Sequence, residues 1–110
     1  MQLSTTPTLQ GFIISEYCSI VSSEVMLNIN AFQGFLTGIR DLIGGRVKGY
    51  ELALRKAREN AFTKLQIQAE ELGAHAVVGI TIDYQMIGKG GNMLMICIKG
   101  TAVKLLAQTP

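Results

Sequence analysis

The sequence is short of charged residues. Only 16% of its 110 residues are Asp, Glu, Lys or Arg, whereas 48% are hydrophobic. An ordinary globular domain carries roughly 25% charge. A chain of this length forms one small domain with much surface for its volume, so this composition predicts that apolar side chains are covered by other subunits. We therefore expect a single domain over residues 1–110 that self-associates.

Long hydrophobic runs are also absent, so a membrane is not expected to cover the apolar side chains. Apolar stretches such as 76–80 are far shorter than the roughly 20 residues of a spanning helix. The opening residues, MQLSTTPTLQG, lack the basic and apolar segments of a signal peptide. Cys18 and Cys97 have no Cys-x-x-Cys spacing and are expected to be reduced thiols. These absences predict a cytoplasmic protein with no membrane partner.

Nucleic-acid binding and catalysis lack their usual patterns. Aromatic residues make up 6% of the chain, and interleaved charges sum to only +2, so we expect no nucleic-acid partner. The single histidine, His75, and the lack of a spaced carboxylate pair give no catalytic triad, and we expect no enzyme. His75 is also a weak metal cue, because zinc sites usually need three or four ligands, and we interpret it as a surface or capping residue.

The first half of the chain contains strand and helix patterns in a clear order. Residues 1–10 indicate an arm or an edge strand, and 11–21 indicate a strand on which alternation places Cys18 and Ile20 together. A helical stripe over 30–43 should end at Gly44-Gly45, because glycine readily ends a helix. A second helix is predicted from near Tyr50 to Gly73, with its stripe at Tyr50, Leu54, Ala57, Ala61, Leu65, Ala69 and Leu72.

The second half predicts a β-hairpin. Residues 74–88 and 92–106 have strand patterns and are joined by a glycine-rich turn over 88–92. The whole order is strand, helix, helix, strand, strand. The most economical architecture is an α+β fold with one small sheet and helices packed on one of its faces.

Met93, Met95 and Cys97 alternate along the last predicted strand. Alternation puts their side chains on one face, in steps of about 7 Å. Thioether and thiolate sulfur suit Cu(I) and similar soft ions, so this face is a candidate metal site. Cys18 joins it only if the first strand neighbours the last. The alternative is packing, because Met and Cys fill cores readily, and packing is the favoured reading here.

A second candidate region surrounds Gly44-Gly45-Arg46, ahead of the second helix. Backbone N–H groups of a glycine loop and a helix N-terminus bind anions, and neighbouring basic residues would help. The alternative is a corner stabilised by ion pairs. Asp83, in mid-strand, is interpreted as an interface ion pair in preference to a ligand contact. The candidate anion, ligand or interface residues are Arg40, Asp41, Gly44, Gly45, Arg46, Tyr50, Asp83 and Tyr84.

Several separated blocks of the sequence form a recognisable pattern. They are Gly38-Ile39-Arg40-Asp41, Gly44-Gly45-Arg46, Tyr50-Glu51, Ala57-Arg58, Ala61, Leu72-Gly73-Ala74, Ala76-Val77-Val78-Gly79, Asp83-Tyr84, Met93-Leu94-Met95 and Gly100-Thr101-Ala102-Val103. In this order they resemble the YbjQ family of small, uncharacterised bacterial proteins, described as heavy-metal-binding. The resemblance extends over nearly the whole chain. It implies a compact α+β subunit that assembles into a ring, expected to be a pentamer.

The sequence thus predicts a non-enzymatic cytoplasmic homo-oligomer that binds a metal ion or a small anion at a subunit interface. The cofactor is unknown, with a soft metal ion as the candidate. The alternative is a purely structural or interaction ring without a ligand. A third reading, an enzyme with a composite interface site, requires Asp83, Tyr84 and Arg46 to converge in one pocket.

Overall fold

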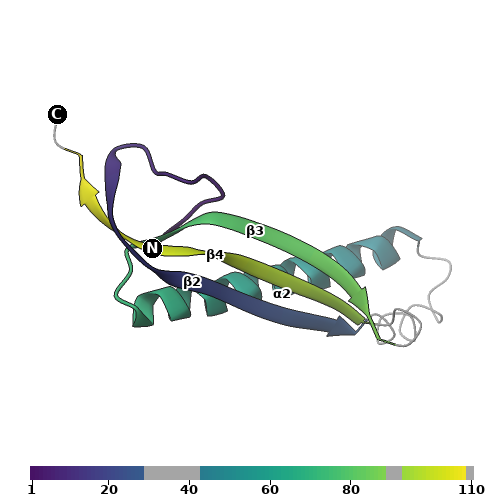
Figure 1. The fold of residues 1–110 in the computed structure, drawn as a ribbon. Helices are drawn as coiled ribbons and strands as arrows, with labels where there is room; N and C mark the ends of the chain where they lie inside the picture. Colours follow the sequence, from purple (N-terminus) through teal and green to yellow (C-terminus); the bar gives the residue numbers. More distant parts are fainter. Residues whose placement is uncertain (29–42, 89–92, 109–110) are drawn as a thin grey trace.

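The computed structural model describes residues 1–28, 43–88 and 93–108 (Figure 1). They form strands β1 (Gln2–Leu3), β2 (Phe12–Asn28), β3 (Ala76–Ile87) and β4 (Met93–Ala107), and helix α2 (Ile43–Glu71). The strands make one mixed sheet in the order β1-β3-β4-β2. This confirms the α+β class and the sheet with a helix on one face. The helix predicted over 30–43 lies almost wholly outside the described residues.

The sheet is built around β4, which is antiparallel to both β2 and β3. The predicted pairing of the last two strands is therefore confirmed. The predicted edge strand is confirmed as well, because β1 pairs in parallel with β3 through Gln2 and Leu3. The predicted first strand is longer than expected, since β2 continues to Asn28.

The apolar stripe of α2 packs mainly over β2 and β4 (Figure 1). The predicted stripe is confirmed at its centre, where Ala57, Ala61, Leu65 and Ala69 are buried. Small side chains at these positions let the helix lie close to the sheet. Ser23 of β2 is buried under the helix, and its Oγ donates a 2.6 Å hydrogen bond to the carbonyl of Ala61. The last predicted member of the stripe, Leu72, is exposed.

Gly73 ends α2 as predicted. Its φ is +73°, in the left-handed region that glycine adopts without strain. The N–H of Ala74 donates to the carbonyl of Ala69, and the N–H of Gly73 donates to that of Glu70. These two bonds form a Schellman motif, which satisfies carbonyls that the helix end leaves free.

The start of α2 corrects the sequence prediction. We expected Gly44-Gly45 to end one helix and a new helix to begin near Tyr50, but α2 begins at Ile43 and contains all three residues. Two glycines cost a helix about 2 kcal/mol relative to alanine, which is why they predict a stop. The helix has 29 residues, and the packing of its C-terminal half against the sheet offsets that cost.

Bulges correct the predicted alternation on two strands. On β2 the register shifts between Ile14 and Glu16 and between Tyr17 and Ser19, so Ser15 and Cys18 are extra residues relative to β4. On β3 the shift lies between Val78 and Thr81. An extra residue reverses the face on which later side chains point. Cys18 therefore packs on the helix-covered core, and Ile20 lies on the other face.

A second, smaller core lies on the side of the sheet away from α2, at one end of the sheet. It contains Leu9, Ala76, Val78 and Val103. Residues 4–11 form the loop between β1 and β2 at this end of the sheet (Figure 1), and Leu9 of this loop packs in the second core. The other end of the same face has no such cover among the described residues.

The described part is elongated, with principal extents of 60 × 28 × 19 Å. Its radius of gyration is 17.9 Å, whereas a compact domain of this length has about 13 Å. Among the described residues, no helix is long and apolar enough to cross a membrane.

Candidate functional site

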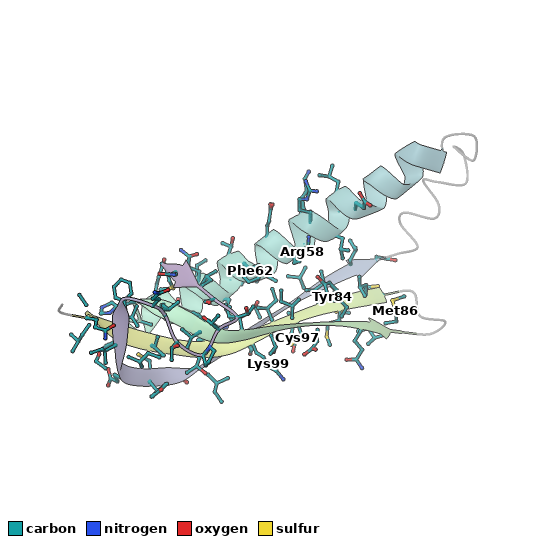
Figure 2. The ribbon with its side chains drawn as sticks, turned by 90° about the horizontal axis from the view of Figure 1, so that it is seen from above. Arg58, Phe62, Tyr84, Met86, Cys97 and Lys99 are labelled. Atoms are coloured by element: carbon teal, nitrogen blue, oxygen red, sulfur yellow. The ribbon has the colours of Figure 1, made fainter. Side chains whose placement is uncertain are left out.

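On the sheet face away from α2, the end that no described residue covers is a surface that we call the open face. Strand pairing puts residues from three strands on it, all pointing away from α2. In Figure 2, Cys97 and Lys99 lie on this side of the sheet, and Arg58 and Phe62 lie on the helix side. The open face consists of Ser22, Glu24 and Met26 of β2, Met95, Cys97 and Lys99 of β4, and Thr81, Asp83 and Gln85 of β3.

Cys97 is at the centre of the open face. Its neighbour on β2 is Glu24 and its neighbour on β3 is Asp83, so a carboxylate stands on each side of the thiol. Residues opposite each other on antiparallel strands have Cα atoms roughly 4.5–5.5 Å apart. Cys97 is half-buried, whereas both acids are exposed. The thiol is thus partly open to solvent, and each neighbouring strand carries an acidic residue at the paired position.

Sulfur donors form the adjoining row. Met26 of β2 is directly opposite Met95 of β4, and Met95 is two residues from Cys97 on the same strand. Met93 follows on the same side and is paired with Asn28 and Ile87. Met26, Met95 and Cys97 therefore offer two thioethers and one thiol on neighbouring positions of one face. Methionine has three rotatable bonds, so its sulfur atom can swing over distances of this size.

This donor set fits a soft metal ion better than a hard or borderline one. Among the described residues, no group of three or more His, Cys, Asp and Glu side chains comes together as a ligand cluster. Zinc sites are built from such clusters. Thiolate and thioether ligands instead select Cu(I) and similar ions. The open face supplies that chemistry from three strand positions.

Cys18 does not join this set. The first long strand does neighbour the last, which was the condition for its joining. The bulge at Cys18, however, turns its side chain to the helix side, where it packs against the core beneath α2. The two cysteines thus lie on opposite faces of the sheet.

Asp83 and Tyr84 also separate. Asp83 is on the open face and Tyr84 points to the helix side, where its Oη accepts a 3.2 Å hydrogen bond from Nη1 of Arg58 (Figure 2). Arg46 lies within α2, in a stretch whose side chains are outside the description. Adjacent residues of one strand face opposite ways, so Asp83 and Tyr84 do not converge in a single pocket. The composite enzyme site therefore has no support.

The predicted glycine loop for an anion is not a loop. Gly44, Gly45 and Arg46 belong to the first turns of α2, and the backbone of Tyr50 continues that helix. Arg40 and Asp41 lie outside the described residues. The geometry on which the anion hypothesis depended is therefore absent from the part of this region that the structure describes.

His75 takes a local structural role. Its Nδ1 accepts a 2.9 Å hydrogen bond from the backbone N–H of Leu105. Its own backbone N–H donates to the carbonyl of Val103. The interpretation of His75 as a surface residue that caps backbone fits these contacts.

Sequence reasoning missed Glu24 and Met26, because the predicted strand ended at Val21. The signal was present: Ser22, Glu24 and Met26 alternate with the buried or half-buried Ser23, Val25 and Leu27. Ser22, Ser23 and Glu24 concealed it, because three consecutive polar residues interrupt the apolar pattern and glutamate is uncommon in strands.

Comparison with known proteins gives the family and the fold of the chain. A family model described as "Putative heavy-metal-binding" matches residues 1–106. A crystal structure of a protein with unknown function from Pediococcus pentosaceus has a similar fold, with a TM-score of 0.66 at 17% identity. That similarity covers 96% of this chain and 98% of the other.

Proposed function

Because the chain belongs to the YbjQ family, we propose that it is a non-enzymatic, homo-oligomeric cytoplasmic protein that binds a soft heavy-metal ion on its open face. The family model is described as "Putative heavy-metal-binding". The ring of five subunits is part of the proposal and is what the resemblance to the family led us to expect. The observation that carries the proposal is the placement of Met26, Met95 and Cys97 on neighbouring positions of one surface, which no described residue covers.

Each of these residues has a distinct role in the proposed site. Cys97 binds as the thiolate, so metal binding releases its proton. Met95 and Met26 supply thioether sulfur from two adjacent strands. Glu24 and Asp83 stand on both sides of Cys97 and offset the positive charge of the bound ion. In this proposal the protein only binds the metal ion and catalyses no reaction.

The two cysteines provide a matched test, since they lie on opposite faces of the sheet. We expect wild-type protein incubated with Ag(I), a soft cation that is stable in air, to retain about one ion per subunit after desalting. Elemental analysis of Cys97→Ser should show at least a tenfold loss of bound silver, because the anionic sulfur ligand is gone. Cys18→Ser should retain silver at the wild-type level.

The contradicting result is equally specific. Equal silver in wild type and Cys97→Ser, or a larger loss in Cys18→Ser, would exclude the open face as the site. Met26→Leu and Met95→Leu preserve apolar volume and remove only the sulfur, so they separate coordination from packing. We expect each to weaken silver binding without unfolding the protein.

A further inference from the structure

The side of β3 that faces α2 is only partly covered, because the helix packs mainly over β2 and β4. Tyr84 and Met86 of β3 are paired with Ile96 and Leu94 of β4, which are buried on the helix side of the sheet. Paired residues of neighbouring strands point to the same face. Tyr84 and Met86 therefore lie on the helix side as well, yet their side chains remain 46% and 54% exposed.

Arg58 reaches this surface from α2. Its Nη1 donates a 3.2 Å hydrogen bond to Oη of Tyr84. In Figure 2, Arg58 lies on the sheet side of the helix and Tyr84 lies next to it on β3. We call these two residues the Arg–Tyr pair. The fold thus brings a guanidinium and a phenol from two separate elements together at the surface.

The Arg–Tyr pair has unused hydrogen-bond donors. A guanidinium has five N–H groups, and a phenol can donate its O–H while its oxygen accepts. Among the described residues, no carboxylate pairs with Arg58 and no group accepts the O–H of Tyr84. Arg58 is half-buried, and a cation that is partly removed from water is usually paired with an anion. The donors of the pair are therefore suited to an anionic ligand.

A single carboxylate matches these donors in number and in charge. Its oxygens can accept from the guanidinium N–H groups and from the phenol O–H, and hydrogen bonds to an ionised acceptor are the strong ones. One carboxylate balances the one charge of Arg58, whereas a phosphate carries up to two. The exposed Glu51 and Arg55, four residues apart on α2, offset each other and leave that balance unchanged.

Apolar side chains surround the Arg–Tyr pair. Phe62 follows Arg58 by one turn of α2, and Ile82 and Met86 are two residues before and after Tyr84 on β3. Phe62 and Ile82 are half-buried against the main core. These few side chains can cover the apolar body of a small molecule. A protein partner would need a contact of about 20 residues on each side.

We propose that Arg58 and Tyr84 bind the carboxylate of a small amphipathic acid, with an aliphatic chain that lies against Phe62 and Met86. The inference does not rest on the metal site. Adjacent residues of a strand point to opposite faces, so Tyr84 lies on the helix side while Asp83 lies on the open face. The acid and the metal ion thus occupy separate sites.

Octanoate is the probe, and two compounds separate its parts. Octanol has the aliphatic chain without the charge, and acetate has the charge without the chain. We expect NMR titration of isotope-labelled wild-type protein to show that octanoate binds about tenfold more tightly than either compound. The Nε–H signal of Arg58 and the backbone amide signals of Tyr84 and Met86 should shift with octanoate.

Single-group variants test the two residues. Arg58→Gln removes the charge and keeps a long polar side chain, and Tyr84→Phe removes only the hydroxyl. We expect the affinity for octanoate to fall about tenfold in Arg58→Gln and about threefold in Tyr84→Phe, because each loses hydrogen bonds to a charged group. Lys64→Gln on α2 and Tyr17→Phe on β2 make the matching changes at exposed positions, and both should bind octanoate as wild type does.

Several results would overturn the proposal. Wild-type protein that does not bind octanoate, or binds it no more tightly than octanol, would exclude a carboxylate site. Unchanged affinity in Tyr84→Phe, or an equal loss in Lys64→Gln and Arg58→Gln, would exclude the Arg–Tyr pair. Tyr84→Phe changes one atom of an exposed side chain, so it decides the matter if Arg58→Gln does not fold.

The same variants separate this inference from the proposed function. Arg58→Gln and Tyr84→Phe should retain silver at the wild-type level, whereas Cys97→Ser should bind octanoate as wild type does. Octanoate binding without silver binding supports the Arg–Tyr pair and refutes the metal site, and the converse result does the reverse.

Discussion

Gly100 shows how one residue accommodates the bulge of β3. A Cβ added there would lie 2.7 Å from Cγ1 of Val77, 2.9 Å from Cγ1 of Ile80 and 3.1 Å from the carbonyl oxygen of Val78. Two of these atoms belong to core side chains and one to the backbone, so the neighbours have little room to yield. Glycine is required at this position by close approach of two strands.

We therefore predict that Gly100→Ala destabilises the protein by about 1–3 kcal/mol, the usual range for overpacking a core. Urea denaturation at one fixed protein concentration measures it. Gly49→Ala is the control: nothing lies within 4 Å of its added Cβ, and it is inside α2. Alanine there should stabilise the helix by up to about 1 kcal/mol. Equal effects of the two changes would contradict this account of Gly100.

Gly73 allows a second prediction at the scale of one residue. Its positive φ and the two hydrogen bonds that follow α2 define the turn into β3. Gly73→Ala should cost about 1–2 kcal/mol, because a Cβ is strained in the left-handed region. Space is not the cause, since the nearest atom to the added Cβ is Cε of Lys104 at 3.8 Å. Denaturation midpoints that match wild type would show that the turn adapts without strain.

At the scale of elements, the Gln68 side chain joins α2 to the edge of β2. It satisfies both backbone groups of Ser22, with distances of 2.7 and 3.1 Å. Gln68→Ala should destabilise the protein by about 1–2 kcal/mol, since two hydrogen bonds are lost. Gln66→Ala is the matched control, because that amide only bonds Glu70 on the same helix. A loss no larger than the control's would mean that water replaces Gln68 at the strand edge.

The elements also show what the sequence can predict and why the rest escapes it. Alternation on β4 places Met93, Met95 and Cys97 on one face of the strand and the buried Leu94, Ile96 and Ile98 on the other face. The structure confirms that arrangement. The prediction holds because the inserted residues lie on β2 and β3, so the alternation along β4 is not interrupted. On β2 and β3 a period of two cannot be extended past an inserted residue. On β3 the glycine at the register shift, Gly79 with φ +61°, was a signal of the bulge; the shifts on β2 contain no glycine.

The candidate site was predictable in part for the same reason. The β4 residues of the open face follow from their spacing alone. Glu24, Met26 and Asp83 become their neighbours only through strand order and register, which depend on long-range pairing. The helix start at Ile43 escaped because a glycine pair predicts a stop, whereas the structure continues α2 through both glycines.

At the scale of the whole molecule, low charge content and elongated shape have one explanation. Among the described residues, α2 covers one face of the sheet, and the loop over residues 4–11 covers part of the other. Large apolar side chains such as Ile20 and Tyr17 remain exposed on β2. We therefore predict that a subunit of this form buries them in an assembly.

The most direct test of metal binding on the open face is native mass spectrometry of the wild-type protein with and without Ag(I). One spectrum gives both the number of subunits and the number of ions. We predict a single closed ring whose mass rises by one silver ion per subunit, and no such increase in the ring of Cys97→Ser. A ring, or a monomer, that takes up no silver, or takes up the same amount without Cys97, would contradict the account.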